Sequence, residues 1–420
     1  MNYQVTSAAV VIEPQLTEIA VEQKPPVKKA FFYLPELDGL RTVGFLYMFM
    51  AHSSIIPQPH GHFFLTDWYN VFVKWGVIGL DMFFVLSGYL ITTLLLKERL
   101  KNGNISLPLY FKRRMLRIWP LFYLVIFVGA FVIPFVSTRH LDMQLYQRFL
   151  GEIFLPMFFF LGNYALIFKA YTLQALTAGL NFPLASLFRP LWSVCSEEQF
   201  YVTWPFVVRK AKTWQGLTCI IAGLTVLSMC FRFYFQQYSL THTRGIWTPS
   251  DFYHYNTLCG LDTLMAGALI ATVQLQLPKF WEKLCKFGAP IAVIPFLILG
   301  SMIIFLPEPG NSVYIVPMYL AIALLCGMVL IGTLSWAPLR SFLALFAPIG
   351  KSTYGMYLVH HPIILICEKY FKTHGSLGYN EQFYAIRFFT SLFLTVLVGQ
   401  LLYHTIEKRL EVLRKKYARI

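Results

Sequence analysis

Ten apolar runs, each long enough to cross a bilayer, constrain this chain of 420 residues more than any other feature. A transmembrane helix needs roughly 17 to 25 mostly apolar residues, because lipid offers no partner for a free backbone N–H or C=O group. The runs are 40–56, 71–96, 118–136, 190–208, 214–234, 253–275, 287–306, 313–333, 350–367 and 384–404. The predicted fold class is therefore all-α, a polytopic integral membrane protein with about ten transmembrane helices.

The composition agrees with a membrane protein, and the basic residues indicate its orientation. Hydrophobic residues make up 57% of the chain and charged residues only 13%. The net charge of +15 does not indicate a nucleic-acid partner, because Lys and Arg gather in short loops between apolar runs. Such loops stay on the cytoplasmic side. With ten spans every basic cluster falls on that side, so we expect both termini in the cytoplasm and the protein in the inner (cytoplasmic) membrane.

The apolar runs predict one large domain with two short ends. Residues 1–33 are expected to form a flexible cytosolic tail without a cleaved signal peptide, since they lack a basic start and a clean apolar core. Residues 34–405 form the transmembrane domain, and residues 406–420 a basic cytosolic tail. The seven cysteines have no CxxC spacing, so we expect small buried hydrophobes with neither a disulfide framework nor a metal site.

Residues 145–170 contain one further apolar run. Counting it as a span would move the basic cluster at 209–212 to the outside. Pro156 and Gly162 also interrupt the run. We therefore predict a re-entrant or interfacial element on the outer side of the membrane.

The first span carries two polar side chains that lipid does not tolerate without a reason. Arg41 lies near its start and His52 deep inside, eleven residues later. At ~100° per residue this separation is within about 20° of three full turns, so both side chains share one face, with the imidazole ~16 Å beyond the guanidinium. A fixed cation and a titratable base in one membrane interior predict a functional site. Asp38 in the same run is counted as a supporting residue.

Acidic residues lie in two further spans. Asp81, in the second span, needs a partner, which would be Arg41 or His52; the alternative is a hydrogen bond between packed helices. Glu197 and Glu198 are neighbours in the fourth span, and because they point ~100° apart at most one can face a central cavity. That carboxylate could accept a proton or orient a histidine. The alternative is an interfacial carboxylate solvated by headgroups.

Arg114 and Arg117, between the second and third spans, are three apart and share a helix face, where they could grip a phosphate from the cytoplasmic side. The ordinary excess of basic residues in cytoplasmic loops would also explain them.

Asp262 in the sixth span and His360 in the ninth are candidates for which a packing role is equally compatible. His361 is expected to point away from His360. Three basic residues at outer helix ends are expected to extend toward the interface: Lys74, Arg232 and Arg387.

Five stretches together resemble one family: PELDGLRTVGFLYMFMAH, GVIGLDMFFVLSGYLIT, YFKRRMLRIWPLF, LWSVCSEEQFYVTWP and STYGMYLVHHP. They make the chain similar to the membrane-bound acyltransferase 3 family, which acylates sugars and other hydroxyl compounds of the cell envelope. Some members add an extracytoplasmic SGNH-type esterase domain. Only about 16 residues follow the last run here, too few for a domain, so the chain resembles the stand-alone members.

The resemblance implies an acyl-CoA donor on the cytosolic side and an acceptor hydroxyl reached from the other face. The family's functional residues match these positions of the chain: Arg41, His52, Arg114, Arg117, Glu197 or Glu198, and His360 with Pro362. The expected function is transfer of an acyl group, expected to be acetyl, from acyl-CoA to a hydroxyl of an envelope carbohydrate such as lipopolysaccharide O-antigen or exopolysaccharide. Acyl-CoA is then a co-substrate, and no permanently bound cofactor or metal is expected.

In this hypothesis His52 takes the proton of the acceptor hydroxyl, with Glu197 or Asp81 fixing its tautomer. Arg41 guides the thioester or stabilises charge on its carbonyl oxygen, and the other two arginines hold the CoA phosphates. Direct transfer and an acyl-enzyme on His52 both stay open. The alternatives from other classes are a transporter or exporter of a glycan, lipid or acyl compound, and a structural membrane subunit.

Overall fold

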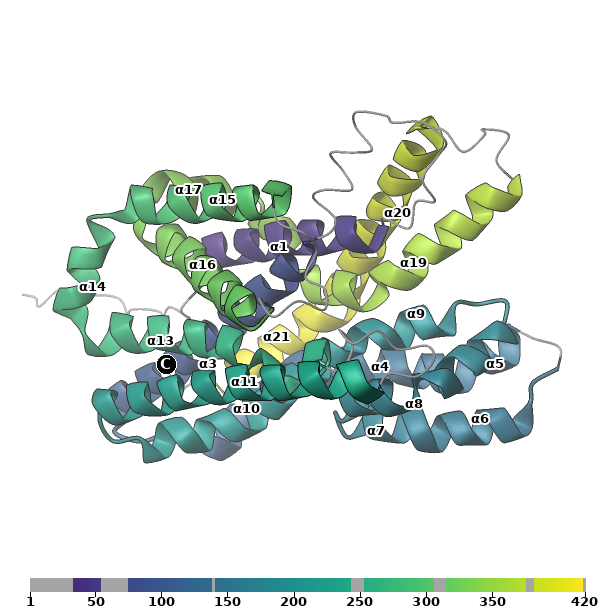
Figure 1. Ribbon diagram of the computed structural model, residues 1–420, viewed down its shortest axis with the longest axis horizontal. Helices are drawn as coiled ribbons and strands as arrows, with labels where there is room; N and C mark the ends of the chain where they lie inside the picture. The colour runs from purple at the N-terminus through teal and green to yellow at the C-terminus, as the bar shows by residue number, and fades with distance from the viewer. Residues whose placement is uncertain are drawn as a thin grey trace, which may run out of the picture.

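The computed structural model describes residues 33–53, 75–137, 140–242, 253–305, 315–374 and 381–417. Within these ranges every regular element is a helix, and no strand occurs (Figure 1). The long helices are α1 (Pro35–Ser53), α3 (Val77–Asn102), α4 (Leu107–Phe127), α8 (Gly162–Ala178), α10 (Trp192–Lys210), α11 (Trp214–His242), α13 (Leu261–Gln276), α15 (Gly288–Phe305), α16 (Ile315–Ser335), α19 (Thr353–His374) and α20 (Glu381–Leu402).

Shorter helical pieces connect the long helices. The α-helical ones are α5 (Ile133–Val136), α6 (Met143–Phe149), α7 (Leu155–Phe158), α9 (Leu184–Phe188), α14 (Pro278–Cys285), α17 (Ala337–Ala344), α18 (Ala347–Gly350) and α21 (Lys408–Lys415). The π-helical segments are η1 (Val128–Val132), η2 (Leu150–Phe154) and η5 (Tyr403–Glu407), and the 3₁₀ segments are η3 (Arg189–Leu191) and η4 (Thr257–Gly260). The tail predicted for residues 1–33 lies outside the described residues except for Tyr33, and Lys74 also lies outside them.

Seven helical segments of the described chain are long and apolar enough to cross a membrane. They are Ile78–Asn102, Leu107–Val136, Trp214–Tyr238, Thr257–Gln276, Gly288–Phe305, Val316–Ser335 and Ala385–Lys415. The remaining three predicted spans also form helices, α1, α10 and α19, of 19, 19 and 22 residues. These three carry the ionisable side chains of the candidate site, which makes them less apolar than the others. The protein is a multi-pass helical membrane protein.

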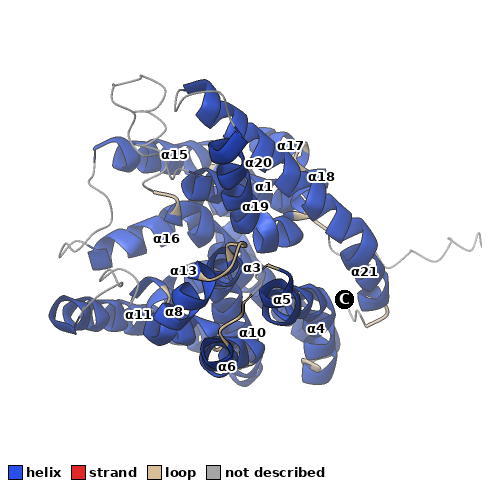
Figure 2. Cartoon of the chain, turned by 90° about the vertical axis from the view of Figure 1, so that its right-hand side faces the viewer, coloured by secondary structure: helices blue, strands red, loops and turns tan. Residues whose placement is uncertain are grey.

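Helices α1 and α3 lie at the centre of the packing (Figure 2). Helix α1 begins with Pro35, whose ring presets a helical φ, and its first turn carries Glu36 and Asp38, which complement the helix dipole. Side chains of both helices enter both large hydrophobic clusters. In α1, Phe45 belongs to the cluster shared with α4, α10 and α19, and Leu40 to the cluster shared with α16. The two central helices therefore join the two halves of the molecule.

Outer helices expose apolar side chains, as lipid contact requires. On α20, Phe389 and Phe393 are each 66% exposed, and α15 exposes Leu297 to 64%. Lipid tails are as apolar as these side chains, so such faces need no cover in a membrane. Their position on the outside supports a bilayer as the surrounding medium.

The run at 145–170 is a helical hairpin in the structure. Segments α6, η2 and α7 form its first arm and α8 the second, and the arms pack against each other. The chain reverses around Phe160, whose φ of 56° lies in the left-handed region. Neither arm is among the seven segments that qualify as spans. The run is therefore helical and folds back on itself, and its placement as a re-entrant or interfacial element on the outer side stays a prediction.

The residues assigned to a basic tail continue as helix to residue 415. Segments η5 and α21 follow α20, and α21 packs against α4. Arg113 of α4 donates a 2.9 Å hydrogen bond to the backbone oxygen of Tyr417, and Lys112 lies over the Tyr417 ring. This packing brings the end of the described chain next to the part of α4 that carries Arg114 and Arg117.

Helices α3 and α13 approach each other closely through two glycines. A Cβ atom added at Gly88 would collide with the backbone oxygen of Leu264, and one added at Gly267 with the backbone oxygen of Val85. Each glycine therefore lets the backbone of the other helix come near, as small residues commonly do between membrane helices.

We expect Gly267→Ala to destabilise the purified protein by about 1–3 kcal/mol, because the methyl group must push two buried backbones apart. The measurement is thermal unfolding in detergent. Gly223→Ala is the matched control, since a Cβ there meets nothing within 4 Å. An unchanged melting temperature for Gly267→Ala would contradict this account of the helix contact.

Candidate active site

His52, near the end of α1, contacts two consecutive histidines of α19. Its Nδ1 lies 2.7 Å from Nε2 of His360. Its ring stacks on both partners, with centroids 4.9 Å from His360 and 5.1 Å from His361. The sequence predicts that His361 points away from His360, yet the two ring centroids lie 6.0 Å apart and both rings contact His52. Three imidazoles from two helices thus form one cluster.

The hydrogen bonds of His360 fix the tautomer of His52. Nδ1 of His360 lies 2.6 Å from the backbone oxygen of Tyr357, and a carbonyl oxygen can only accept. Neutral His360 therefore carries its proton on Nδ1 and accepts at Nε2, so the bond from His52 must come from an Nδ1–H group. This leaves the lone pair of His52 on Nε2. In the described residues a histidine, and not the predicted carboxylate, orients His52.

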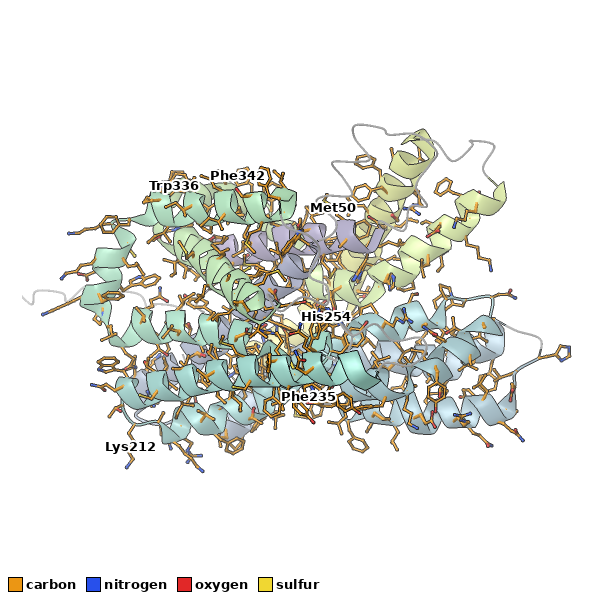
Figure 3. The ribbon with its side chains drawn as sticks, in the orientation of Figure 1. Met50, Lys212, Phe235, His254, Trp336 and Phe342 are labelled. Atoms are coloured by element: carbon orange, nitrogen blue, oxygen red, sulfur yellow. The ribbon has the colours of Figure 1, made fainter. Side chains whose placement is uncertain are left out.

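His52 lines a cavity of about 340 Å³. Apart from histidines, its polar lining comes from Arg189 and two tyrosines, and no carboxylate belongs to the lining residues that the structure describes. The lining residues are Met48, Ala51, His52, Gly76, Leu80, Arg189, Pro190, Trp192, His254, Tyr255, Tyr357 and His361. In Figure 3 His254 lies near the middle of the molecule, below Met50 of α1. A titratable base therefore faces a space large enough for a small ligand.

Sequence reasoning missed several cavity residues. Arg189 lies just before a stretch that the family resemblance had marked, and Trp192 belongs to that stretch. Tyr357 lies in another marked stretch. His254 precedes α13 in an aromatic segment, FYHYN, that carries no recognisable motif. Only proximity in the folded chain connects His254 with His52.

Four arginines gather away from this cavity, on α1, α4 and α21. Arg117 has Arg41, Arg114 and Arg414 as electrostatic neighbours, and all four are half-buried. Arg41 pairs with Asp38 at 2.5 Å, whereas the other three form no ion pair within the described residues. Arg114 also lies 5.5 Å from the Tyr201 ring. None of the four lines the cavity of His52, so the predicted guanidinium and base occupy two separate regions of one helix.

The arginine cluster lies at a definite end of the molecule. The start of α4 lies close to the end of α10: Arg113 of α4 pairs with Glu98 of α3 at 2.8 Å, and Arg99 of α3 donates to the backbone oxygens of Val208 and Ala211. Arg41, an electrostatic neighbour of Arg117 on α4, lies nearer this end than His52 does. The basic cluster at 209–212 follows the end of α10 and therefore lies at this end as well.

Glu197 lies between the arginine cluster and the cavity. It accepts hydrogen bonds from Ser87 (2.6 Å) and Tyr201 (3.0 Å). Its electrostatic neighbours are Arg117 and Arg41 on one side, and it also acts on Tyr357, which lines the cavity. Glu198 points elsewhere and accepts from the indole of Trp119 at 3.0 Å. The two carboxylates thus diverge as predicted, and Glu197 is the one that faces the interior polar residues.

Asp81 is buried, and its predicted pairing with Arg41 or His52 is not formed in the described structure. Its Oδ2 atom has no hydrogen-bond partner there. The nearest charges acting on it are those of Asp262 and Arg232. Asp81 and Arg232 line a small second pocket, next to His254. Asp81 therefore lies beside the cavity without touching the imidazole cluster.

Asp262 forms a buried ion pair with Arg232. The two nitrogens of the guanidinium lie 2.7 and 2.8 Å from the carboxylate oxygens, and one also donates to the backbone oxygen of Cys259. Arg232 is only 2% exposed and lies over the ring of Tyr319. The prediction that Arg232 extends to the interface is wrong, because Asp262 offers a better partner inside.

Arg387 is also 2% exposed, donates to the backbone oxygen of Ser53 and lies 3.4 Å from Glu368.

A family profile described as an acyltransferase domain matches residues 34–404. The chain belongs to the acyltransferase 3 family. The chain is 28% identical over 348 residues to the peptidoglycan O-acetyltransferase OatA of Listeria monocytogenes, covering 80% of this chain and 50% of the relative. It is 29% identical over 395 residues to the putative peptidoglycan O-acetyltransferase YrhL of Bacillus subtilis, covering 90% and 54%.

A putative O-acetyltransferase of Staphylococcus aureus is 23% identical over 389 residues, covering 90% of the acyltransferase and 57% of that relative. The chain thus spans about half the length of the curated relatives it matches. No solved structure matches it.

We expect Asp262→Ala to destabilise the acyltransferase by about 3–5 kcal/mol, because it leaves the guanidinium of Arg232 buried without a counter-charge. Replacing both partners, as Asp262→Leu with Arg232→Met, should recover most of that loss. Thermal unfolding in detergent measures both effects. If the double variant unfolds at the same temperature as Asp262→Ala, the ion pair does not explain the role of Asp262.

Proposed function

We propose that this acyltransferase moves an acyl group, most simply acetyl, from cytosolic acyl-CoA to a hydroxyl group of a cell-envelope glycan. Membership of the family supports acyl transfer. Two of its relatives carry names that specify peptidoglycan O-acetylation. These names favour a peptidoglycan-type acceptor over lipopolysaccharide O-antigen or exopolysaccharide, which no observation on this chain favours.

The observation that carries the proposal is the free Nε2 lone pair of His52, whose side chain lines a cavity. An acceptor hydroxyl in the cavity can donate its proton to this nitrogen as its oxygen attacks the thioester carbonyl carbon. The C–S bond then breaks, and the proton passes from His52 to the departing thiolate of CoA. Positive charge that forms on His52 can spread along the hydrogen bond to His360, whose own Nδ1–H is held by the Tyr357 carbonyl.

The arginine cluster supplies the donor end of the site. Arg114, Arg117 and Arg414 lack ion-pair partners in the described chain, and guanidinium groups bind phosphates through paired N–H donors. His52 lies about 16 Å further along α1 than Arg41, so the long flexible arm of CoA would bridge the two regions while its phosphates stay with the arginines. Arg41 and Glu197 lie along this route.

The proposed topology has ten spans with both termini in the cytoplasm. It counts α1, α10 and α19 as spans together with the seven apolar segments. The arginine cluster then faces the cytosolic CoA pool, since it shares its end of the molecule with the basic 209–212 loop. The hairpin of α6, η2, α7 and α8 lies toward the outer face, where an envelope acceptor would arrive.

We expect His52→Ala to lower kcat for acetyl transfer by about 10²–10⁴-fold, because general-base catalysis contributes that much. His360→Ala should cause a smaller loss, since the base stays but its ring is no longer held. The measurement is label transfer from acetyl-CoA to envelope glycan by purified protein, with His404→Ala, an exposed position, as the control. Wild-type kcat in folded His52→Ala would contradict the catalytic role, and a wild-type protein that transfers no label would favour a carrier.

For Arg117→Ala we expect the KM for acetyl-CoA to rise about ten- to a hundredfold, because charge-assisted hydrogen bonds to phosphate are lost. The KM for the acceptor should change little. Steady-state kinetics with each substrate varied in turn separates the two constants, and Arg209→Ala, an exposed arginine at the same end, controls for general attraction of anions. A larger effect on the acceptor KM than on the donor KM would rule out donor binding.

A further inference from the structure

Arg189 is the fixed cation of the cavity that contains His52. The cavity's other ionisable side chains are three histidines and two tyrosines, and none of its described lining residues is acidic. Arg189 is half-buried and forms no ion pair with a carboxylate in the described chain. A guanidinium held away from bulk water without a counter-charge is unfavourable. Arg189 can therefore supply the positive charge that an anionic ligand of this cavity needs.

The backbone around Arg189 is tied to the helix that holds His360 and His361. The hydroxyl of Tyr357 donates a 2.6 Å hydrogen bond to the backbone oxygen of Pro190, and Ser193 hydrogen-bonds to the same hydroxyl. Arg189 itself acts electrostatically on His361, which stacks on His52. These contacts fix where the backbone next to Arg189 lies relative to α19, which carries His360 and His361.

An aromatic group forms another part of the cavity lining. The Trp192 ring centroid lies 4.7 Å from that of His254 and 5.2 Å from that of Tyr255. Aromatic faces carry partial negative charge and attract the polarised C–H groups of a sugar ring. The cavity volume of about 340 Å³ lies at the lower end of the range for small-molecule sites. Its size and chemistry fit one sugar unit.

We propose that Arg189 binds a carboxylate of the acceptor, so that the cavity selects an acidic sugar unit and presents one of its hydroxyls to His52. This inference rests on the proposed acyl transfer and adds the class of acceptor. A carboxylate matches the paired N–H donors of one guanidinium. Phosphate groups would instead meet the three unpaired arginines of the other cluster.

The first experiment changes the acceptor and leaves the protein intact. Soluble oligosaccharides released from the cell envelope are offered to the wild-type protein with labelled acetyl-CoA, either untreated or with their carboxylates converted to methyl esters. We expect kcat/KM for the untreated mixture to exceed that for the esterified mixture at least tenfold, because a charged hydrogen bond is lost on esterification. Equal transfer to both mixtures overturns the inference and leaves the acyltransferase proposal standing. Absence of transfer to either mixture overturns the proposed function and, with it, this inference.

The second experiment changes the protein. Arg189→Gln should raise the KM for the untreated mixture about tenfold and abolish the preference over esters, and Arg189→Lys should keep part of it. Arg148→Gln is the matched control, since Arg148 is 53% exposed on the hairpin. If Arg189→Gln keeps the preference, or lowers kcat equally for both mixtures with KM unchanged, Arg189 does not bind the acceptor carboxylate. Should Arg189→Gln fail to fold, the comparison of the two mixtures with wild-type protein still decides.

Discussion

The hydrogen bond between His52 and His360 is the interaction on which the proposed chemistry depends. Two neutral imidazoles can bond only if one donates and the other accepts, and the Tyr357 carbonyl determines which does which. The Tyr357 carbonyl belongs to the backbone of helix α19, which holds it in place, and it has no titratable proton. The protonation pattern of the base is therefore set by helix geometry, without a buried carboxylate that would need its own counter-charge.

The polar residues inside the protein are separated into distinct groups. Three arginines without ion-pair partners in the described chain lie toward one end, the imidazoles and Arg189 line a cavity further along, and Arg232 with Asp262 forms a closed pair. Paired and unpaired charges have different consequences in a low-dielectric interior. In the ion pair of Arg232 with Asp262 each charge neutralises the other, and the pair stabilises helix contacts. The unpaired guanidiniums remain available for ligands.

Much of the fold could be predicted from the sequence, because crossing a bilayer imposes length and apolarity on each helix. Each of the ten predicted spans corresponds to a helix, and the extra run at 145–170 is a hairpin. Periodicity also predicted that Glu197 and Glu198 diverge. It could not predict contacts between helices: the partners of Asp81 and Arg232, the contact of His361 with His52, and the presence of Arg189 and His254 in the cavity depend on how helices distant in sequence are rotated against each other. A single helix's periodicity carries no information on that rotation.

The packing of α21 against α4 has a consequence for how the protein is made. Arg41 enters the membrane with the first helix of the described chain, and Arg114 and Arg117 follow early, but Arg414 joins them only after every other described helix has left the ribosome. The guanidinium cluster thus combines arginines that are synthesised early with one that is synthesised late. Until α21 docks against α4, a nascent chain has an incomplete guanidinium cluster, so the proposed donor site forms only at the end of synthesis.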